Sequence, residues 1–366
     1  MPSERILAEE VGVNYMTVRR AFQILEQENL AIRQPNGRMQ IKRIKHGGMK
    51  HLNFAFLTPI FDSNDVEIWR LAIEKAVEKF PCSMRPVVYM HWDDPILIDA
   101  LKGFDGVFLY PIHTPLPESL AEILRKPEHP VVVVDDDFSH YGLPSIQFLP
   151  PKYVQRLLDH LDSLGHKKIG CFNTQPSNSV VSGRIDQWRY WMAARGLTGR
   201  LIDSPVPVRA SPIPHAYDLM TEVLSQPHCE ETAWLCITAP AALGAMRAML
   251  DKGVVPGRDM AICAVNGEEM AAMLNPRLTA LEPVNPVPFF LHCLNWMSQG
   301  RHWQGPLLMT PSDIPLYIRE STQPDAAKRN VPTPNLNHIV AGDWGADPAS
   351  PTPKGKPARS LLRKTA

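Results

Sequence analysis

The stretch from Pro2 to Phe22, PSERILAEEVGVNYMTVRRAF, predicts two short helices joined by a turn. Ser3 is a good N-cap for the first helix, because its hydroxyl can accept a hydrogen bond from a backbone N–H that has no partner inside the helix. Gly12 ends that helix, since glycine adopts the left-handed backbone conformation at little cost. Asn14 is a second N-cap, and an apolar face follows it at helical spacing, formed by Val18, Ala21, Phe22 and Leu25.

Each predicted helix has one apolar face and one polar face. Ile6, Leu7 and Val11 share the apolar face of the first helix. Residues 31–42 then predict two short strands around Asn36-Gly37, which is the strongest short signal for a β-hairpin. Two helices followed by a hairpin describe a winged helix-turn-helix. Its second helix leaves four side chains facing outward, namely Tyr15, Thr17, Arg19 and Arg20.

Several spaced segments of this region resemble the GntR-type winged-helix DNA-binding domain over about forty residues. They are Pro2–Arg5, Val13–Ala21, Leu25–Leu30 and Asn36–Arg38. The resemblance implies that phosphates meet Ser3 and Arg5, that the major groove receives Asn14, Tyr15, Thr17 and Arg19 with Arg20 beside them, and that the minor groove is approached by Asn36, Gly37 and Arg38.

Two positions depart from the family pattern. Tyr15 stands where the family usually has a basic or small polar residue. The family's first helix should precede Pro2, so we expect the true start of the protein to lie upstream of Met1. The alternative, a small helical hairpin with a solvated charged face, is less favoured because turn, caps, spacing and wing coincide.

Composition and charge fit a protein of several globular parts. The chain has 366 residues, 44% of them hydrophobic, which suggests two or three domains. The net charge is zero, but residues 1–50 carry nine Lys and Arg against five Asp and Glu. A basic head on an acidic body is expected of a regulator whose parts have different partners. No signal peptide or membrane-length apolar run is present, so we expect a cytoplasmic protein.

After a short basic linker with two glycines, residues 44–51, apolar segments alternate with helical patterns. Strands are predicted at 52–57, 87–90, 106–110, 130–135, 169–172, 233–237 and 259–265, and helices at 65–80, 95–101, 116–125, 151–164, 184–195, 216–224 and 240–252. Strands that are apolar throughout imply a parallel sheet covered on both faces. Two successive α/β halves predict a two-lobed domain.

Three spaced segments resemble the effector domain of the lac-repressor (LacI/GalR) family, which is itself similar to periplasmic sugar-binding proteins. They are 158–170, 242–250 with Gly253 and Pro256, and 262–265 running on to 275–279. The resemblance covers residues 52–321, without the family's hinge helix, whose place the glycine linker takes. The predicted fold is therefore α/β: an N-terminal winged helix-turn-helix (α+β) at 1–43, and a two-lobed, periplasmic-binding-protein-like domain with parallel sheets at 52–321.

Candidate effector-binding residues lie near the carboxyl ends of the predicted strands, where α/β folds bind ligands. Asp135 directly follows a strand of four valines. The family resemblance implies that Arg184 holds ligand hydroxyls and that Glu268 is an acidic ligand contact. Thr58, Asp65 and Tyr110 lie near the cleft ends of other strands. The alternative for each is a solvated loop charge or a helix cap.

Two departures weaken the sugar interpretation. Thr238-Ala239 stand where the family commonly has an Asn-Asp pair, and the segment 147–150, QFLP, lacks the usual aspartate. A ligand less hydroxylated than a simple hexose, or a pocket that has lost its ligand, therefore stays open.

Motifs for an enzyme are missing from the sequence: it has no G-x-S-x-G, no H-E-x-x-H and no phosphate-binding glycine loop. His160 and His166 are predicted to be structural, and Trp188 and Trp191 to lie in the core. We expect no catalytic residue, metal or cofactor. The six cysteines form no C-x-x-C pair and are predicted to be thiols, the buried ones among them being Cys171, Cys236 and Cys263.

Residues 322–366 contain seven prolines and few large apolar residues, so a disordered basic tail is expected. The whole sequence predicts a ligand-responsive transcription regulator, most simply a repressor, that binds operator DNA as a homodimer and senses a sugar or related small molecule. A ligand-independent DNA-binding regulator is the alternative. A solute-binding protein is disfavoured, because it would have no use for residues 1–43.

Overall fold

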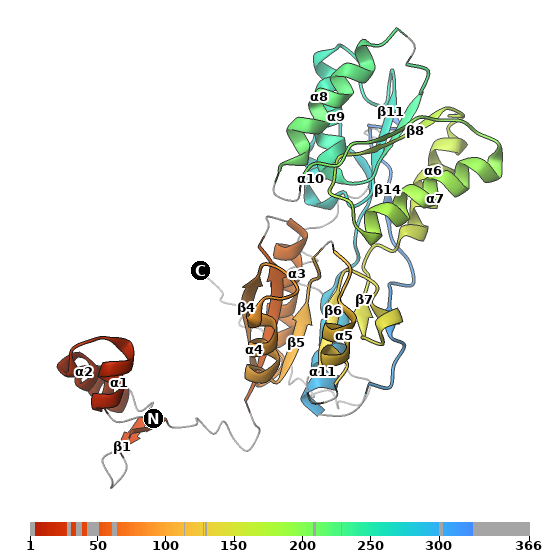
Figure 1. Ribbon diagram of the computed structural model, residues 1–366. Coiled ribbons are helices and arrows are strands. Elements are labelled where there is room, and N and C mark those ends of the chain that lie inside the picture. Colours follow the sequence, from red (N-terminus) through yellow and green to blue (C-terminus); the bar gives the residue numbers. More distant parts are fainter. Residues whose placement is uncertain are drawn as a thin grey trace, which may run out of the picture.

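The structure, a computed structural model, describes residues 4–27, 31–33, 39–41, 51–60, 64–112, 114–126, 128, 130–207, 210–227, 229–299 and 303–324. These residues form an N-terminal pair of helices with a small hairpin, and two α/β lobes (Figure 1). No helix in these ranges is both long and apolar enough to cross a bilayer.

The N-terminal segment has the predicted order of two helices and two strands. They are α1 (Glu4–Val11), α2 (Tyr15–Gln27), β1 (Ala31–Arg33) and β2 (Met39–Ile41), with β1 and β2 antiparallel. Gly12 has a φ of 70°, as its role as a helix stop requires. The Met16 amide donates to Asn14 Oδ1 at 2.8 Å, which confirms the second cap. Ser3, the 44–50 part of the linker and the predicted turn at Asn36-Gly37-Arg38 lie outside the described residues.

A small core holds this segment together. Two expectations about it were wrong: Ile6 is 49% exposed, and Ala21 is exposed as well. Ala8 takes the buried position on α1, because the hairpin covers the face of the helix pair on which Ala8 lies. The buried residues are Ala8, Val18, Phe22, Ala31 and Met39, with Leu7 and Leu25 packed against them.

The first lobe is built on a six-stranded sheet of order β13-β7-β6-β5-β3-β4, in which every neighbouring pair is parallel. Helices cover both faces: α3 and α11 lie on one, α4 and α5 on the other. The elements are β3 (Leu52–Pro59), α3 (Asn64–Val77), β4 (Cys82–Tyr89), α4 (Pro95–Gly103), β5 (Gly106–Leu109), α5 (Glu118–Leu124), β6 (Val131–Val134), η1 (Ser139–Tyr141), β7 (Ser145–Ile146), α11 (Val287–Gln299) and β13 (Leu308–Met309).

The second lobe repeats this plan with a sheet of order β14-β12-β11-β10-β8-β9, parallel except for β14. Its faces are covered by α6 and α7 on one side and by α8, α9 and α10 on the other. The elements are η2 (Pro151–Tyr153), α6 (Val154–Ser163), β8 (Ile169–Asn173), α7 (Ser179–Arg195), β9 (Leu201–Asp203), α8 (Pro212–Ser225), β10 (Ala233–Cys236), α9 (Ala239–Asp251), β11 (Ala261–Ala264), α10 (Glu268–Met273), β12 (Thr279–Leu281) and β14 (Leu316–Tyr317).

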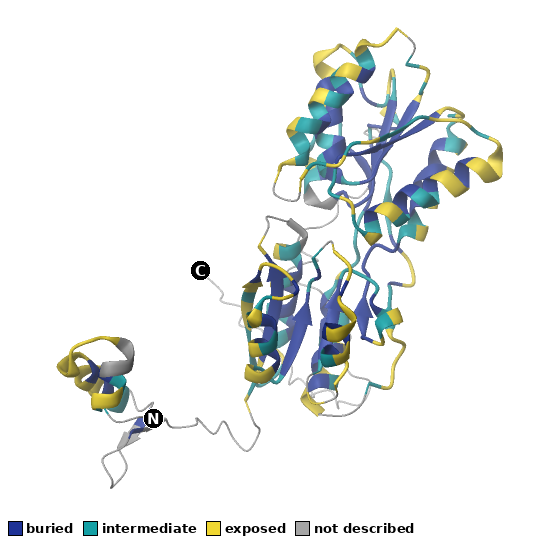
Figure 2. Ribbon diagram, viewed as in Figure 1, coloured by how far each residue is buried: buried dark blue, intermediate teal, exposed yellow. Residues whose placement is uncertain are grey.

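The sequence predicted that the lobes are two successive halves of the chain, and this prediction was wrong. After β12 the chain returns to the first lobe, forms α11 and β13, and then crosses back to form β14. The physical reason is that, without α11, part of the first sheet would expose apolar surface. Phe290, Cys293, Leu294 and Met297 of α11 are buried against this sheet. Figure 2 shows the buried strands in the middle of each lobe with exposed helix faces outside.

Candidate functional site

The exposed face of α2 carries the predicted DNA-reading side chains. Val18 and Phe22 are buried against α1 and the hairpin, so the opposite face of the helix points to solvent. The exposed residues include Asn14, Tyr15, Thr17, Arg19 and Arg20, and Arg5 is exposed on α1. A helix that presents guanidinium, hydroxyl and amide groups in this way can donate to base edges and phosphates.

In the first lobe, three predicted effector-binding residues come to one edge of the sheet. Thr58 is the penultimate residue of β3, Tyr110 directly follows β5, and Asp135 directly follows β6. These strands are neighbours in the order β6-β5-β3, so the three residues share the carboxyl edge. Thr58 is buried and the other two are half-buried. Asp65 lies in the first turn of α3, and its side chain is outside the described part.

In the second lobe, Arg184 reaches the corresponding edge from α7. Its side chain is buried, and Nη1 donates to the Ile237 carbonyl at 3.1 Å, one residue beyond β10. Glu268 opens α10, which follows β11, the strand next to β10. The Glu268 side chain lies outside the described part, so its position relative to Arg184 stays a prediction.

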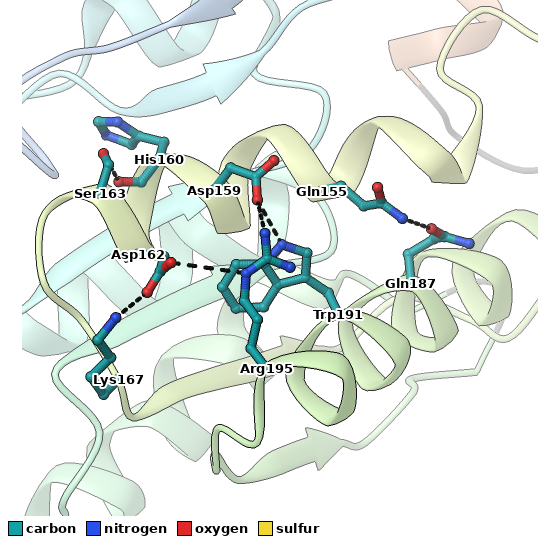
Figure 3. Close-up of polar contacts among 9 residues, drawn as sticks. All are labelled: Gln155, Asp159, His160, Asp162, Ser163, Lys167, Gln187, Trp191 and Arg195. Atoms are coloured by element: carbon teal, nitrogen blue, oxygen red, sulfur yellow. Dashed lines mark hydrogen bonds and ion pairs between the residues drawn. The ribbon is translucent and has the colours of Figure 1, made fainter.

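Packing between α6 and α7 fixes the helix that carries Arg184. Trp191 Nε1 and Arg195 Nη2 each donate to Asp159 Oδ1 at 2.8 Å, and the Arg195 guanidinium lies 4.0 Å from the centre of the Trp191 ring (Figure 3). Gln155 donates to Gln187 at 2.9 Å further along the same pair of helices. These contacts tie one side of α7 to α6, so its first turns point toward the first lobe in a defined direction.

Backbone strain marks the same edge in both lobes. Asp135, after β6, has a φ of 64°, and Asn266, after β11, has a φ of 62°. Left-handed conformations cost free energy at residues other than glycine and concentrate at binding sites. Asn266 is also buried, although no sequence pattern singled it out. Its position directly after the predicted strand 259–265 is the sequence signal that could have identified Asn266 as a candidate site residue.

A hydrogen bond joins the two edges across the lobes. Ser179 Oγ, in the first turn of α7, lies 2.8 and 3.0 Å from the two carboxylate oxygens of Asp136, which follows β6. Burial raises the pKa of Asp136, while hydrogen bonds from Asp137 and Ser179 oppose that rise. The sequence singled out Asp135 and not its neighbour Asp136. Both residues follow the valine strand, and only the structure shows which carboxylate contacts the second lobe.

The positions that depart from the family pattern are engaged inside their own lobes. Thr238-Ala239 stand where an Asn-Asp pair is common, and Thr238 Oγ1 accepts a hydrogen bond from Gln175 Nε2 at 3.2 Å. Gln147 is buried after β7, and its backbone N–H donates to the Met309 carbonyl at 3.0 Å. Both edges therefore present neutral polar groups at these two places.

Residues expected to be structural are so. His160 and His166 each lie 2.9 Å from a threonine hydroxyl, that of Thr322 and that of Thr232 respectively. Trp188 and Trp191 are buried in the core between the second sheet and its two helices. Cys171, Cys236 and Cys263 are buried, and burial raises the pKa of each thiol. Within the described ranges, no group of three His, Cys, Asp or Glu residues could hold a metal ion.

Two family models match the chain. Residues 1–41 match the model described as bacterial regulatory proteins, gntR family, and residues 158–284 match the model of a periplasmic binding protein-like domain. None of the curated proteins compared with this chain is a significant match.

Solved structures with this fold include transcription regulators. A lac repressor dimer bound to operator and the anti-inducer ONPF is 19% identical, with a TM-score of 0.61 over 75% of this chain and 96% of its own. A transcription regulator GntR from Chromobacterium violaceum is 20% identical, with a TM-score of 0.61 over 74% and 99%. The LacI family regulator CCPA from Weissella paramesenteroides, with bound glucose, is 15% identical, with a TM-score of 0.60 over 74% and 98%. At such identities the likeness shows the fold. The chain thus joins an N-terminal segment that matches the model of the gntR family of bacterial regulatory proteins to a two-lobed domain with a periplasmic-binding-protein-like fold, the fold also seen in the lac repressor.

Proposed function

We propose that this protein is a ligand-responsive transcription regulator of the cytoplasm and not an enzyme. The N-terminal segment reads operator DNA, the two-lobed domain senses a small molecule between its sheets, and two copies act together. The observation that carries this proposal is the combination of a gntR-family segment, whose α2 exposes Arg19 and Arg20, with the two-lobed fold behind it.

DNA reading rests on the side chains that α2 leaves in solvent. A helix in the major groove uses its N-terminal residues to contact base edges, and Asn14 to Arg20 occupy that end. Arg5 and Arg19 supply phosphate or base contacts. Because such contacts release counterions, the affinity for DNA falls steeply with salt. A two-fold dimer then requires a near-palindromic operator.

Sensing rests on the two strand edges that Asp136 and Ser179 bring together. Relatives of the same fold have been crystallised with glucose and with the anti-inducer ONPF, so the space between the lobes is the proposed effector site here as well. Arg184 is the proposed hydroxyl-binding group on one edge, with Thr58, Tyr110 and Asp135 on the other. An effector that binds one lobe arrangement better than another shifts the equilibrium between them, and the spacing of the DNA-reading heads changes with it.

A selection from random DNA, followed by affinity measurements, tests the DNA-binding part. We expect a near-palindromic site. Arg19→Ala should weaken binding to this site by about thirtyfold or more, since a bidentate contact between an arginine and a base contributes roughly 1–3 kcal/mol. If Arg19 contacts the DNA backbone instead, the variant loses a phosphate contact. Arg189→Ala is the matched control, because Arg189 is exposed on α7 in the second lobe. Unchanged affinity of Arg19→Ala would exclude α2 as the reading helix.

A thermal-shift screen against sugars and sugar derivatives tests the sensing part. A stabilising compound should lose its effect in Arg184→Ala and in Arg184→Lys, which keeps the charge but not the planar fork, and should keep it in Arg189→Ala. A blank result over a broad screen would favour the ligand-independent regulator. The observation behind that second candidate is that Thr238-Ala239 stand where the family commonly has an Asn-Asp pair and that the segment 147–150 lacks the usual aspartate.

A further inference from the structure

The edge of the first lobe carries a groove that the proposed function does not use. It lies between α11 and the edge strand β13 and has a volume of about 410 Å³. The residues that line it are mostly apolar: Pro288, Phe289, His292, Pro306, Leu308, Met309 and Thr310.

Aromatic side chains make the flank of this groove rigid. Trp303 packs edge-to-face against His292 at 5.5 Å and against Trp296 at 4.9 Å, between ring centres. Trp303 Nε1 also donates to the Pro306 carbonyl at 3.1 Å, which closes the turn that leads into β13. The helix on the other side, α11, contains no Asp, Glu, Lys or Arg. Grooves lined by aromatic side chains bind proline-rich segments in the polyproline II conformation.

The sequence contains a segment of matching chemistry. The described chain ends at Pro324, and residues 325–366 follow it. Within them, Pro348-Ala349-Ser350-Pro351-Thr352-Pro353 has three prolines in six residues and no charge. The stretch after it is basic, with Lys354, Lys356 and Arg359, and does not match an uncharged groove.

Chain length decides which proline-rich stretch can reach. Thr310 lines the groove and precedes Pro324 by about 14 residues, so the two lie at most about 50 Å apart. Pro348 follows Pro324 by about 24 residues, which span about 75 Å at the polyproline II rise. Pro332 follows by about eight residues, which span at most about 29 Å. The chain between Pro324 and Pro348 is therefore longer than the greatest possible distance between Pro324 and Thr310, whereas the chain between Pro324 and Pro332 is shorter than that limit.

We propose that the proline-rich segment 348–353 docks in the groove between α11 and β13 of its own chain. Pro288 lies in the first turn of α11, directly after one crossing between the lobes, and Thr310 begins the next crossing. A docked tail thus touches two of the segments that connect the lobes. It brings the basic end of the chain to the first lobe, the lobe to which the DNA-reading segment is joined.

Hydrogen exchange of the full chain tests this docking, because it needs neither an effector nor an operator. We expect the amides of residues 303–310 to exchange at least about threefold faster in the variant Pro348→Ala/Pro351→Ala/Pro353→Ala, since docking protects them. The matched control is Pro332→Ala/Pro334→Ala/Pro357→Ala, which changes three other tail prolines and should leave the exchange as in the wild type. A change on the groove side, His292→Ala, should act like the first variant, because His292 is exposed and lines the groove.

Three outcomes would overturn the proposal. Equal exchange in the wild type and the first variant would show that the segment does not cover the groove. Equal acceleration in both triple variants would show that proline content in general, and not this segment, matters. Protection that grows with protein concentration would assign the groove to the tail of a second copy. None of these outcomes bears on DNA binding or sensing, so the proposed function is tested separately.

Discussion

Two buried tryptophans differ in what their indole nitrogens meet. Trp188 Nε1 donates to the Ile169 carbonyl at 3.1 Å. Trp69 is 2% exposed and stacks on Phe148 with ring centres 4.2 Å apart, but within the described part of the chain its Nε1 has no acceptor. A buried donor without a partner costs about 1–3 kcal/mol, whereas a satisfied one contributes about 1 kcal/mol.

This difference predicts unequal costs for the same substitution. Both Trp→Phe changes lose apolar contacts, but Trp69→Phe also removes an unpaired donor, and Trp188→Phe removes a hydrogen bond and leaves a carbonyl without it. We expect Trp188→Phe to lower the free energy of unfolding by about 1–2 kcal/mol more than Trp69→Phe does. Urea unfolding of both variants measures the difference. Equal losses would mean that Trp69 Nε1 finds a partner in solution, such as a bound water.

At the residue scale, the sequence predicted positions better than contacts. Asp135 lies directly after β6 as predicted, because chain neighbours determine where a strand ends. The predicted helix start at Arg184 was wrong, since α7 begins at Ser179 and Arg184 lies in its second turn. The contact between Asp136 and Ser179 could not be foreseen, since it depends on the angle between two lobes. The burial of Ala8 in place of Ile6 likewise depends on the hairpin that packs across α1.

Among the elements, α6 shows how one helix is fixed to a distant part of the chain. His160 Nε2, near the end of α6, lies 2.9 Å from Thr322 Oγ1, which in turn lies 2.7 Å from Thr279 Oγ1 of β12. Burial lowers the pKa of His160, and the nearby His166 lowers it further. The folded protein therefore keeps this imidazole neutral at pH values where the unfolded chain is already protonated.

The sign of the pH effect follows from that shift. In the unfolded state a histidine titrates near pH 6.5, and the folded-state pKa lies below that value. As the pH falls below about 6.5, the unfolded state binds a proton that the folded state excludes, so stability is lost. We expect the melting temperature to fall between about pH 7 and pH 5, and to fall less steeply in His160→Gln. The same slope in both proteins would contradict the assignment to His160.

Elements with strong local signals were predicted, and those that depend on tertiary pairing were missed. The helix α2 was foreseen because Asn14 caps it and its apolar spacing is regular. The sequence did not assign α11, since its run of apolar residues fits a strand as well as a helix. Strands of two residues, such as β13 and β14, exist only because β7 and β12 offer a free edge.

On the scale of the whole molecule, the first lobe presents an apolar surface suited to a second copy. Val88 and Met90, in and after the edge strand β4, are 53% and 55% exposed. Ile60, 48% exposed, lies beside them, because its amide donates to the Tyr89 carbonyl at 3.0 Å. Exposed edges with apolar side chains favour association. We expect the homodimer of the proposed regulator to use this surface.

A single charge placed in that surface tests the expectation. Val88→Asp should weaken dimerisation by at least about tenfold, because it buries a carboxylate at an apolar contact. Sedimentation over a range of protein concentrations measures the shift toward monomer. Lys102→Asp introduces the same side chain on the exposed surface of α4, and it should leave the dimer intact. A dimer unchanged by Val88→Asp would place the interface elsewhere.

The return of the chain to its first lobe also orders events during synthesis. Five strands of the first sheet leave the ribosome early. The helix α11, which shares one face of that sheet with α3, and the strand that pairs with the β7 edge are made only when residues 287–309 emerge. By then β8 to β12 of the second lobe are already complete. A partly uncovered apolar sheet face aggregates readily, and the nascent first lobe stays incomplete in this way for more than a hundred residues of translation. We expect a smaller fraction of chains to fold without aggregating when they are released before residue 287 than when they are released after residue 324, even though both contain the whole DNA-reading segment.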